Sequence, residues 1–414
     1  MQIYVIDKQG NPLMPMERYG KVRRMLKNGQ ARVYSRTPFV IQLCYDIKEP
    51  KCQEVVLGVD AGHKELALSG CSSAQELYAA KVMLRTDVSK LMEAKKNFKR
   101  RRKINRRYRA KRSQNRKRNS EYGWAAPSVK VKVDEIIQAI LRVKQILPVT
   151  EVRMEIAEFN YPQIRQYIYD GIAIPHELDL YDVRQYMLWN SYHTCESCKG
   201  REDTKKLIVV GQEAKDMVVL CANCYLRYEA GKKKLPKPKM RKSPADIPEF
   251  GMVRKYLRRR IYSAIDPSEI VEVYGYQTKI RREKLKLPYS KLNNAFAIAA
   301  STESQSSSDK VYCYKILRRH NRMLHNATVL KGGTRKLHQA PYIVKGFRLW
   351  DKVLFENQEC FVAGRRKTGY FLLKDIKGNI VHTAASYKRI RLLEMSKGYI
   401  VAEYSRKESM FGAE

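Results

Sequence analysis

The sequence predicts an α/β protein built from several domains. Three observations support this fold class: the chain has 414 residues, its hydrophobic residues (44%) suffice for more than one core, and strand-like and helix-like segments alternate along it. At about 150 residues per domain, a chain of this length holds two to four domains.

The charge balance points to a polyanionic partner. The chain has 82 Lys and Arg against 42 Asp and Glu, a formal net charge of +40. Repulsion of that size destabilises a compact fold unless a polyanion screens it, so nucleic acid is the first candidate. No apolar run reaches the roughly 18 residues of a membrane-spanning helix, and the N-terminus lacks the pattern of a secretory signal. We therefore expect no membrane partner and a cytoplasmic location.

The N-terminal segment is predicted to form a small unit of short elements. Ile3–Ile6 is typical of a strand, and Arg18–Asn28 of a short basic helix. Residues 31–45 suit one or two further strands. Pro12–Pro15 reads Pro-Leu-Met-Pro, and its two prolines predict a rigid turn.

Two acids follow strand-like segments. Val55–Gly62 is an apolar run that ends in Asp-Ala-Gly, which suits a buried strand that aims the Asp60 carboxylate into a cleft. Glu65–Gly70 is predicted to be the next strand. Val152–Ile156 alternates as a strand with Glu155 on one face. Glu155 is either an ordinary exposed acid or a second metal-binding carboxylate beside Asp60.

The segment Lys95–Arg118 is the most basic part of the chain. It holds 15 Lys and Arg in 24 residues, with no acid, glycine or proline. We expect an arginine-rich helix that follows nucleic-acid phosphates rather than a merely solvated face. The candidate contacts are Arg100, Arg101, Arg102, Arg106, Arg107, Arg109, Arg112, Arg116 and Arg118.

Four of the nine cysteines form two Cys-x-x-Cys pairs, separated by 22 residues. This spacing predicts a structural zinc site with closed coordination, which would not activate water. Its ligands would be Cys195, Cys198, Cys221 and Cys224. The odd total of cysteines argues against a disulfide framework.

The rest of the chain mixes both kinds of element. Helices are predicted at residues 133–147, 252–265 and 294–300, and a strand at 270–276. The segment Ser301–Asp309 is of low complexity and predicts a domain boundary. Beyond it, the strand-like segments 351–355, 360–363, 369–374 and 379–382 suit a small barrel, with a basic loop at Gly364–Gly369.

The order of these pieces resembles the IscB family, transposon-encoded RNA-guided nucleases related to the CRISPR effectors. Asn11–Pro15 matches the PLMP motif of that family, and Lys95–Arg118 resembles its arginine-rich bridge helix. The three segments of its RuvC nuclease are matched by Leu57–Gly62, Val152–Glu155 and Pro288–Ala300. The cysteine pairs stand where the family inserts its HNH nuclease.

The resemblance implies a split RNase H-like (RuvC) core with an N-terminal PLMP domain and a β-rich C-terminal domain. The implied domains are 1–53 (PLMP), 54–83 (RuvC-like I), 84–127 (bridge helix), 128–192 (RuvC-like II), 193–232 (degenerate HNH-like zinc module), 233–302 (RuvC-like III) and 303–414 (C-terminal).

The implied partners are a guide RNA and a target DNA duplex, bound by a monomer in a ribonucleoprotein at the prokaryotic or phage nucleoid. The C-terminal part would contact RNA through Arg318 and Arg319, and the duplex motif adjacent to the target through Arg365, Arg366 and Lys367.

The chain departs from the family at both nuclease centres. HNH chemistry needs a histidine base between the zinc knuckles, and no histidine lies between Cys198 and Cys221. In the third RuvC segment, Lys291 stands where the family has His, and Asn294 where it has Asp. Asp60 and Glu155 alone offset a metal pair poorly, so we expect little or no Mg²⁺ and an ion pair from Lys291 to one of these acids.

These observations predict an RNA-guided DNA-binding protein that does not cut. Such a protein would form R-loops and act as a transcriptional repressor. Two alternatives stay open: a nickase that depends on Asp60 and Glu155, and a protein that binds structured RNA without guiding.

Overall fold

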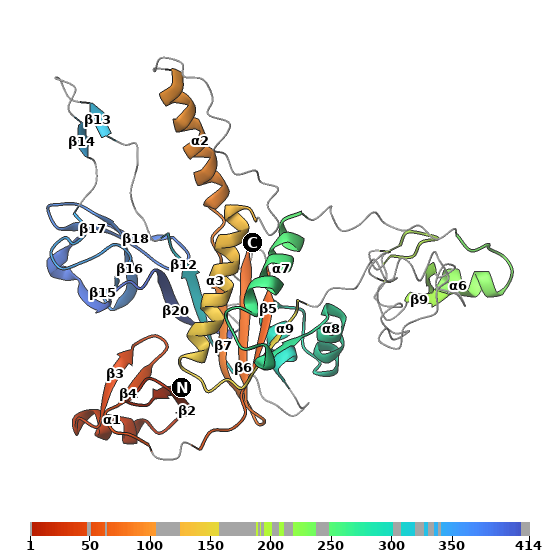
Figure 1. The fold of residues 1–414 in the computed structure, drawn as a ribbon, viewed down its shortest axis with the longest axis horizontal. Coiled ribbons are helices and arrows are strands. Elements are labelled where there is room, and N and C mark those ends of the chain that lie inside the picture. Colours follow the sequence, from red (N-terminus) through yellow and green to blue (C-terminus); the bar gives the residue numbers. More distant parts are fainter. Residues whose placement is uncertain are drawn as a thin grey trace. The chain divides into compact units, whose positions relative to one another are not determined.

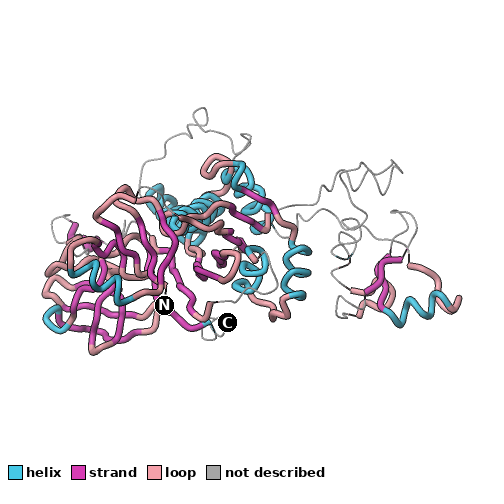
Figure 2. Tube along the Cα trace, turned by 90° about the horizontal axis from the view of Figure 1, so that it is seen from below, coloured by secondary structure: helices cyan, strands magenta, loops and turns pink. Residues whose placement is uncertain are grey.

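The computed structural model describes residues 2–47, 51–62, 64–104, 125–156, 188, 191, 194–200, 207–210, 218–236, 248–300, 308–318, 327–329, 335–337 and 341–406. The architecture is mixed α/β, and the chain divides into two compact units. The larger unit comprises Met1–Glu155, Met252–Val273 and Gln277–Glu414, and the smaller comprises Ile156–Gly251 with Tyr274–Tyr276. Strands predominate in the larger unit (Figure 2). No helix in the described ranges combines the length and apolar character that a bilayer span requires.

The larger unit begins with a four-stranded sheet in the order β2-β1-β4-β3. Its apolar side packs against Val22 and Met25 of a helix whose position agrees with the prediction. The elements are β1 (Ile3–Ile6), β2 (Pro12–Met16), α1 (Tyr19–Lys27), β3 (Ala31–Ser35) and β4 (Val40–Leu43).

The segment Pro12–Pro15 corrects a prediction, because it is part of strand β2 and not a turn. It pairs antiparallel with β1, with Pro12 opposite Ile6 and Leu13 opposite Val5. Proline lacks a backbone N–H and so suits an edge strand, and β2 is the edge of this sheet. The sequence pattern could not show that the segment would find a partner.

A seven-stranded sheet forms the centre of the larger unit, in the order β11-β8-β5-β6-β7-β12-β20 (Figure 1). β5, β6 and β7 run antiparallel in succession, β8 is parallel to β5, β11 is parallel to β8, and β12 is parallel to β7. The strands are β5 (Val56–Ala61), β6 (Glu65–Cys71), β7 (Glu76–Met83), β8 (Glu151–Met154), β11 (Ile270–Glu272), β12 (Lys310–Ile316) and β20 (Tyr399–Ser405).

Helical segments contact both faces of this sheet. Gly58 and Ser69 are directly paired and share a face, on which α9 packs against β5 and β6. Gly70 faces the other way, toward Leu147 in the segment after α3. The helices are α2 (Val88–Ile104), α3 (Pro127–Lys144), α7 (Pro248–Ile261), α8 (Gly275–Lys284) and α9 (Lys291–Ala299), with a short 3₁₀ turn at Pro267–Glu269.

The C-terminal part forms a five-stranded antiparallel sheet, β18-β17-β16-β15-β19, as the β-rich prediction requires. Within residues 341–406, all of which are described, β18 and β19 do not pair, so the predicted barrel is an open sheet. The short 3₁₀ turn Tyr387–Arg389 lies between them. The strands are β15 (Lys352–Phe355), β16 (Gln358–Arg365), β17 (Tyr370–Lys374), β18 (Ile380–Ser386) and β19 (Arg391–Glu394); β13 (Ala327–Val329) and β14 (Arg335–Leu337) form a separate hairpin.

The smaller unit contains an antiparallel hairpin followed by a helix. β9 (Leu207–Val210) pairs with β10 (Val218–Cys221), and α6 (Ala222–Glu229) begins directly after β10. Its apolar core includes three of the four paired cysteines, with Leu207 and Val219 among their neighbours.

Candidate functional site

Two carboxylates lie on adjacent strands of the central sheet. Asp60 belongs to β5, and it is only 6% exposed. Val59 stands opposite Met154 of the parallel strand β8, and the Glu155 N–H donates to the Val59 carbonyl (3.1 Å). Because neighbours in register share a face, Asp60 and Glu155 point the same way. The sequence left open whether Glu155 is an ordinary exposed acid or lies beside Asp60, and the structure places it beside Asp60.

Gly58 determines what covers this pair. Side chains two residues apart in a strand share a face, so Gly58 and Asp60 both face α9. A Cβ at Gly58 would lie within 3 Å of backbone atoms of Ala295 and Ala299. Glycine therefore allows α9 to lie directly on β5, which brings the first turn of α9 over Asp60.

The first turn of α9 supplies two partners for Asp60. The helix begins after Ser290, whose hydroxyl accepts a hydrogen bond from the Asn293 N–H (3.0 Å). Lys291 and Asn294 are three residues apart and so share a face. Lys291 Nζ lies 3.3 Å from Asp60 Oδ1, and Asn294 Nδ2 donates to Asp60 Oδ2 (3.0 Å). The ion pair that the sequence predicted for Lys291 is thus present, with Asp60 as its partner.

Two arginines complete the contacts. Arg282 donates to Asn294 Oδ1 (2.7 Å), which turns the amide nitrogen toward Asp60. The flipped amide would place its nitrogen against the guanidinium and its oxygen against the carboxylate. Arg254 lies 3.7 Å from Glu155 Oε1 and donates to the Glu155 carbonyl (2.9 Å). Sequence reasoning missed both arginines, since neither stands in a motif.

The electrostatics of Glu155 follow from this setting. Burial raises the pKa of Glu155, and the nearby Asp60 charge raises it further. Arg254 and Lys291 oppose the rise without cancelling it. The carboxyl group is therefore harder to ionise than an exposed glutamate.

Each of the two carboxylates has a basic partner. Lys291 pairs with Asp60 and Arg254 with Glu155, and the amide oxygen of Asn294, its only metal-ligating atom, accepts from the Arg282 guanidinium. A site for two divalent ions needs an excess of negative ligands. Lys291, Asn294 and Arg282 thus connect Asp60 of β5 to α8 and α9, and Arg254 connects Glu155, directly after β8, to α7.

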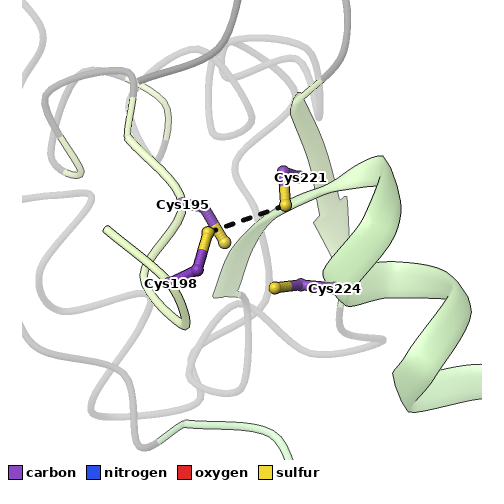
Figure 3. A group of neighbouring side chains, drawn as sticks. All are labelled: Cys195, Cys198, Cys221 and Cys224. Carbon is purple, nitrogen blue, oxygen red and sulfur yellow. Dashed lines mark hydrogen bonds between the residues drawn. The ribbon is translucent and has the colours of Figure 1, made fainter. Parts of the chain in front are cut away.

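The four cysteines of the two Cys-x-x-Cys motifs lie close together in the smaller unit (Figure 3). Their sulfur atoms all lie within 4.8 Å of one another, and Cys198 Sγ and Cys221 Sγ are 3.8 Å apart. Cys195 and Cys198 come from a loop that the Glu196 N–H joins to Val219 of β10 (2.9 Å). Cys221 ends β10, and Cys224 lies in the first turn of α6.

The chemistry of this cluster suits a metal ion. Tetrahedral coordination with Zn–S bonds of about 2.3 Å places sulfurs about 3.8 Å apart, and Cys198 and Cys221 have that separation. Burial acts to raise the pKa of Cys195, but the backbone N–H groups of Cys198 and Cys221 outweigh it and lower that pKa to about 7. The cluster could hold a metal ion such as zinc, with all four positions filled by protein ligands.

The predicted nucleic-acid contacts are described only in part. Arg100 is exposed on α2, and Arg318 is exposed after β12. Arg101 and Arg102 lie within the bounds of α2. The remaining predicted arginines fall outside the described residues: Arg106, Arg107, Arg109, Arg112, Arg116, Arg118 and Arg319.

The predicted duplex-binding loop connects β16 to β17, and its three basic residues differ in how exposed they are. Arg366 and Lys367 are exposed. Arg365 is half-buried and donates to the backbone carbonyl of Tyr342, so its guanidinium is engaged within the fold. Tyr342 itself is 72% exposed. The exposed charges of this loop are therefore those of Arg366 and Lys367.

Residues 3–174 match the family model of the RRXRR proteins. The matched range contains the N-terminal sheet, Asp60, the basic segment Lys95–Arg118 and Glu155. No curated protein matches the chain.

Proposed function

We propose that the chain is an RNA-guided DNA-binding protein, derived from an IscB nuclease, that binds its target without cutting it. The network around Asp60 carries this proposal, because Lys291 and Asn294 contact both oxygens of a carboxylate that a nuclease would need for metal. The match to the RRXRR family supports the ancestry, since that family is associated with IscB nucleases.

The fold gives further support. Three antiparallel strands, β5 to β7, with the parallel strands β8 and β11 beyond β5, suit an RNase H-like (RuvC) core. Asp60 stands in β5, the middle strand of these five, and Glu155 directly follows the neighbouring strand β8. The four-cysteine cluster suits Zn²⁺ as a structural metal of a degenerate HNH module, and the hairpin of that module carries Leu207–Val210 with no base.

In this proposal, guide RNA binds the N-terminal domain and the basic segment, and base pairing selects the DNA. Arg366 and Lys367 approach the duplex motif beside the target. A stable R-loop blocks RNA polymerase, so the cellular role is transcriptional repression by a monomeric ribonucleoprotein at the nucleoid.

The test begins with the complex purified together with its RNA, which is sequenced to identify the guide. The complex is then incubated with supercoiled plasmid carrying the matched target, in Mg²⁺ or Mn²⁺, with a scrambled target as the control. We expect a footprint on the matched strand and no nicking. Nicking that Asp60→Ala abolishes would establish the nickase instead. Tight RNA binding without any guided footprint would establish a structured-RNA-binding protein.

A further inference from the structure

A solvent-exposed tyrosine lies next to the Asp60 network. Tyr289 is 75% exposed, in the loop between α8 and α9. The Arg282 guanidinium carbon lies 5.0 Å from the centroid of its ring, in cation–π contact. The faces of a tyrosine ring are apolar, and an exposed ring supported in this way is a ready surface for stacking.

The tyrosine is positioned by the same contacts that occupy the carboxylate. Arg282 donates to Asn294 Oδ1 (2.7 Å), and Asn294 donates to Asp60 Oδ2 (3.0 Å). A continuous chain of contacts therefore links Tyr289 to strand β5. Binding to a pre-arranged ring costs less conformational entropy than binding to a free one.

Three residues before Tyr289, the charged residue Lys286 adopts a left-handed backbone conformation that is costly for any residue other than glycine. Helix α8 ends in a Schellman motif: the Lys286 N–H donates to the Glu283 carbonyl (3.0 Å), and the Leu287 N–H to the Arg282 carbonyl (3.1 Å). The C′ position is occupied by Lys286 with φ of 54°, where glycine is the usual residue. A non-glycine residue in this strained conformation often marks a functional site.

The surroundings are basic. Lys284 and Lys286 are exposed, and Lys291 is half-buried nearby in sequence. No acid occurs between Glu283 and Glu303. The exposed Lys286 at a position where glycine is usual, the exposed ring and the lack of acids from residue 284 to residue 302 favour an anionic ligand with flat aromatic faces.

We propose that Tyr289, Lys284 and Lys286 bind single-stranded nucleic acid, with an unpaired base stacked on the Tyr289 ring and its flanking phosphates near the two ammonium groups. Bases inside a duplex have both faces covered by neighbours, so the surface selects unpaired strands. The inference rests on the proposed function only in its choice of nucleic acid as partner, because it requires neither a guide nor a matched target.

The test uses the full chain with its co-purified RNA and a fluorescent oligothymidylate that matches no part of that RNA. We expect Tyr289→Ala to weaken binding about tenfold at every salt concentration, because stacking carries little salt dependence. Tyr289→Phe keeps the ring and should bind as the wild type does. Tyr262→Ala is the control and should change nothing, because Tyr262 is 39% exposed, donates to Glu272 (2.7 Å) and lies outside the regions assigned to nucleic acid.

Lys286→Gly separates binding from folding. Removing one phosphate contact should reduce the slope of log K against log[salt] by about 0.7. Glycine relaxes the left-handed backbone, so the melting temperature should stay the same or rise, and a misfolded variant cannot explain the loss. A bromouracil-substituted strand should photocrosslink to Tyr289.

Wild-type affinity in both Tyr289→Ala and Lys286→Gly, without a crosslink at Tyr289, would overturn the inference. Equal loss in Tyr289→Phe would also overturn it, since stacking would then not be the cause. The guided footprint is measured separately. If Tyr289→Ala weakens oligothymidylate binding but no guided footprint forms, the proposed function is wrong and this inference stands. If the footprint forms but Tyr289→Ala binds as the wild type does, this inference is wrong and the proposed function stands.

Discussion

Replacing Lys291 with methionine tests whether the lysine ammonium group takes the place of a metal ion beside Asp60. The substitution keeps most of the side-chain volume and removes the charge 3.3 Å from Asp60 Oδ1. At an effective dielectric constant of about 20, the attraction over that distance is about 5 kcal/mol. Desolvation of the carboxylate offsets part of it.

The exposure of the two partners sets the expected net loss. The Asp60 side chain is 8% exposed and that of Lys291 is 27% exposed. Breaking a fully buried ion pair lowers the free energy of unfolding by roughly 3–5 kcal/mol. Because Lys291 is partly exposed, we expect a loss of about 2–3 kcal/mol for this pair. In hydrogen-exchange mass spectrometry, peptides from β5 and α9 should exchange roughly 30- to 150-fold faster, since about 1.4 kcal/mol is a factor of ten.

The metal arm of this experiment uses Mn²⁺. Adding Mn²⁺ should not slow the hydrogen exchange of β5 and α9 in the wild type. In Lys291→Met, where the positive charge beside Asp60 is gone, Mn²⁺ should bind Asp60 and Glu155 and restore part of the protection against exchange. Adding Asp60→Asn to the variant should remove that gain, and Lys255→Met, at an exposed lysine of α7, is the control. Exchange within threefold of wild type, or equal Mn²⁺ protection in the wild type, would refute the reasoning.

Three further predictions concern the same structure. Gly58→Ala pushes a methyl group into the backbone of Ala295, so we expect a loss of about 3 kcal/mol or more, read as faster exchange throughout α9; unchanged exchange would show that α9 does not rest on β5. The raised pKa of Glu155 means that the folded state holds its proton more tightly, so stability falls as pH rises above the ordinary carboxyl range, and Glu155→Gln should melt higher than wild type at neutral pH but not at pH near 4. A higher wild-type melting temperature at neutral pH would contradict this. Elemental analysis should find about one zinc per chain, and Cys195→Ser with Cys198→Ser should lose it and unfold the local module while RNA affinity is largely kept.

Local pattern predicted the elements whose apolar residues are continuous or periodic. The apolar run that contains Asp60 is strand β5, the periodic segment before Leu147 is α3, and the small-residue segment that contains Asn294 is α9. In each of these, most of the apolar residues are buried. The edge strand at Pro12 was mistaken for a turn, because its structure depends on a distant partner rather than on its own composition.

The candidate site was predictable to a similar extent. Spacing located the cysteine cluster, and the apolar run before Asp60 located that carboxylate, whereas the role of Glu155 was left open. Arg254 and Arg282 could not be found in this way, because their roles come from packing between helices and the sheet. The strained Lys286 likewise follows from the register of a helix end, which sequence patterns place only to within a few residues.

The far edge of the central sheet constrains how the chain is made. β20 is the last strand among the described residues, and Arg406 directly after it bonds both oxygens of Glu76, which is 2% exposed in β7. A nascent chain therefore lacks the arginine partner of Glu76 and the strand that pairs with β12 until residues 399–406 have emerged from the ribosome. Unpaired edges template aggregation. Chains cut before Tyr399 should therefore aggregate, so ribosome stalling or proteolysis ahead of that residue would remove the protein rather than leave a shortened, active form.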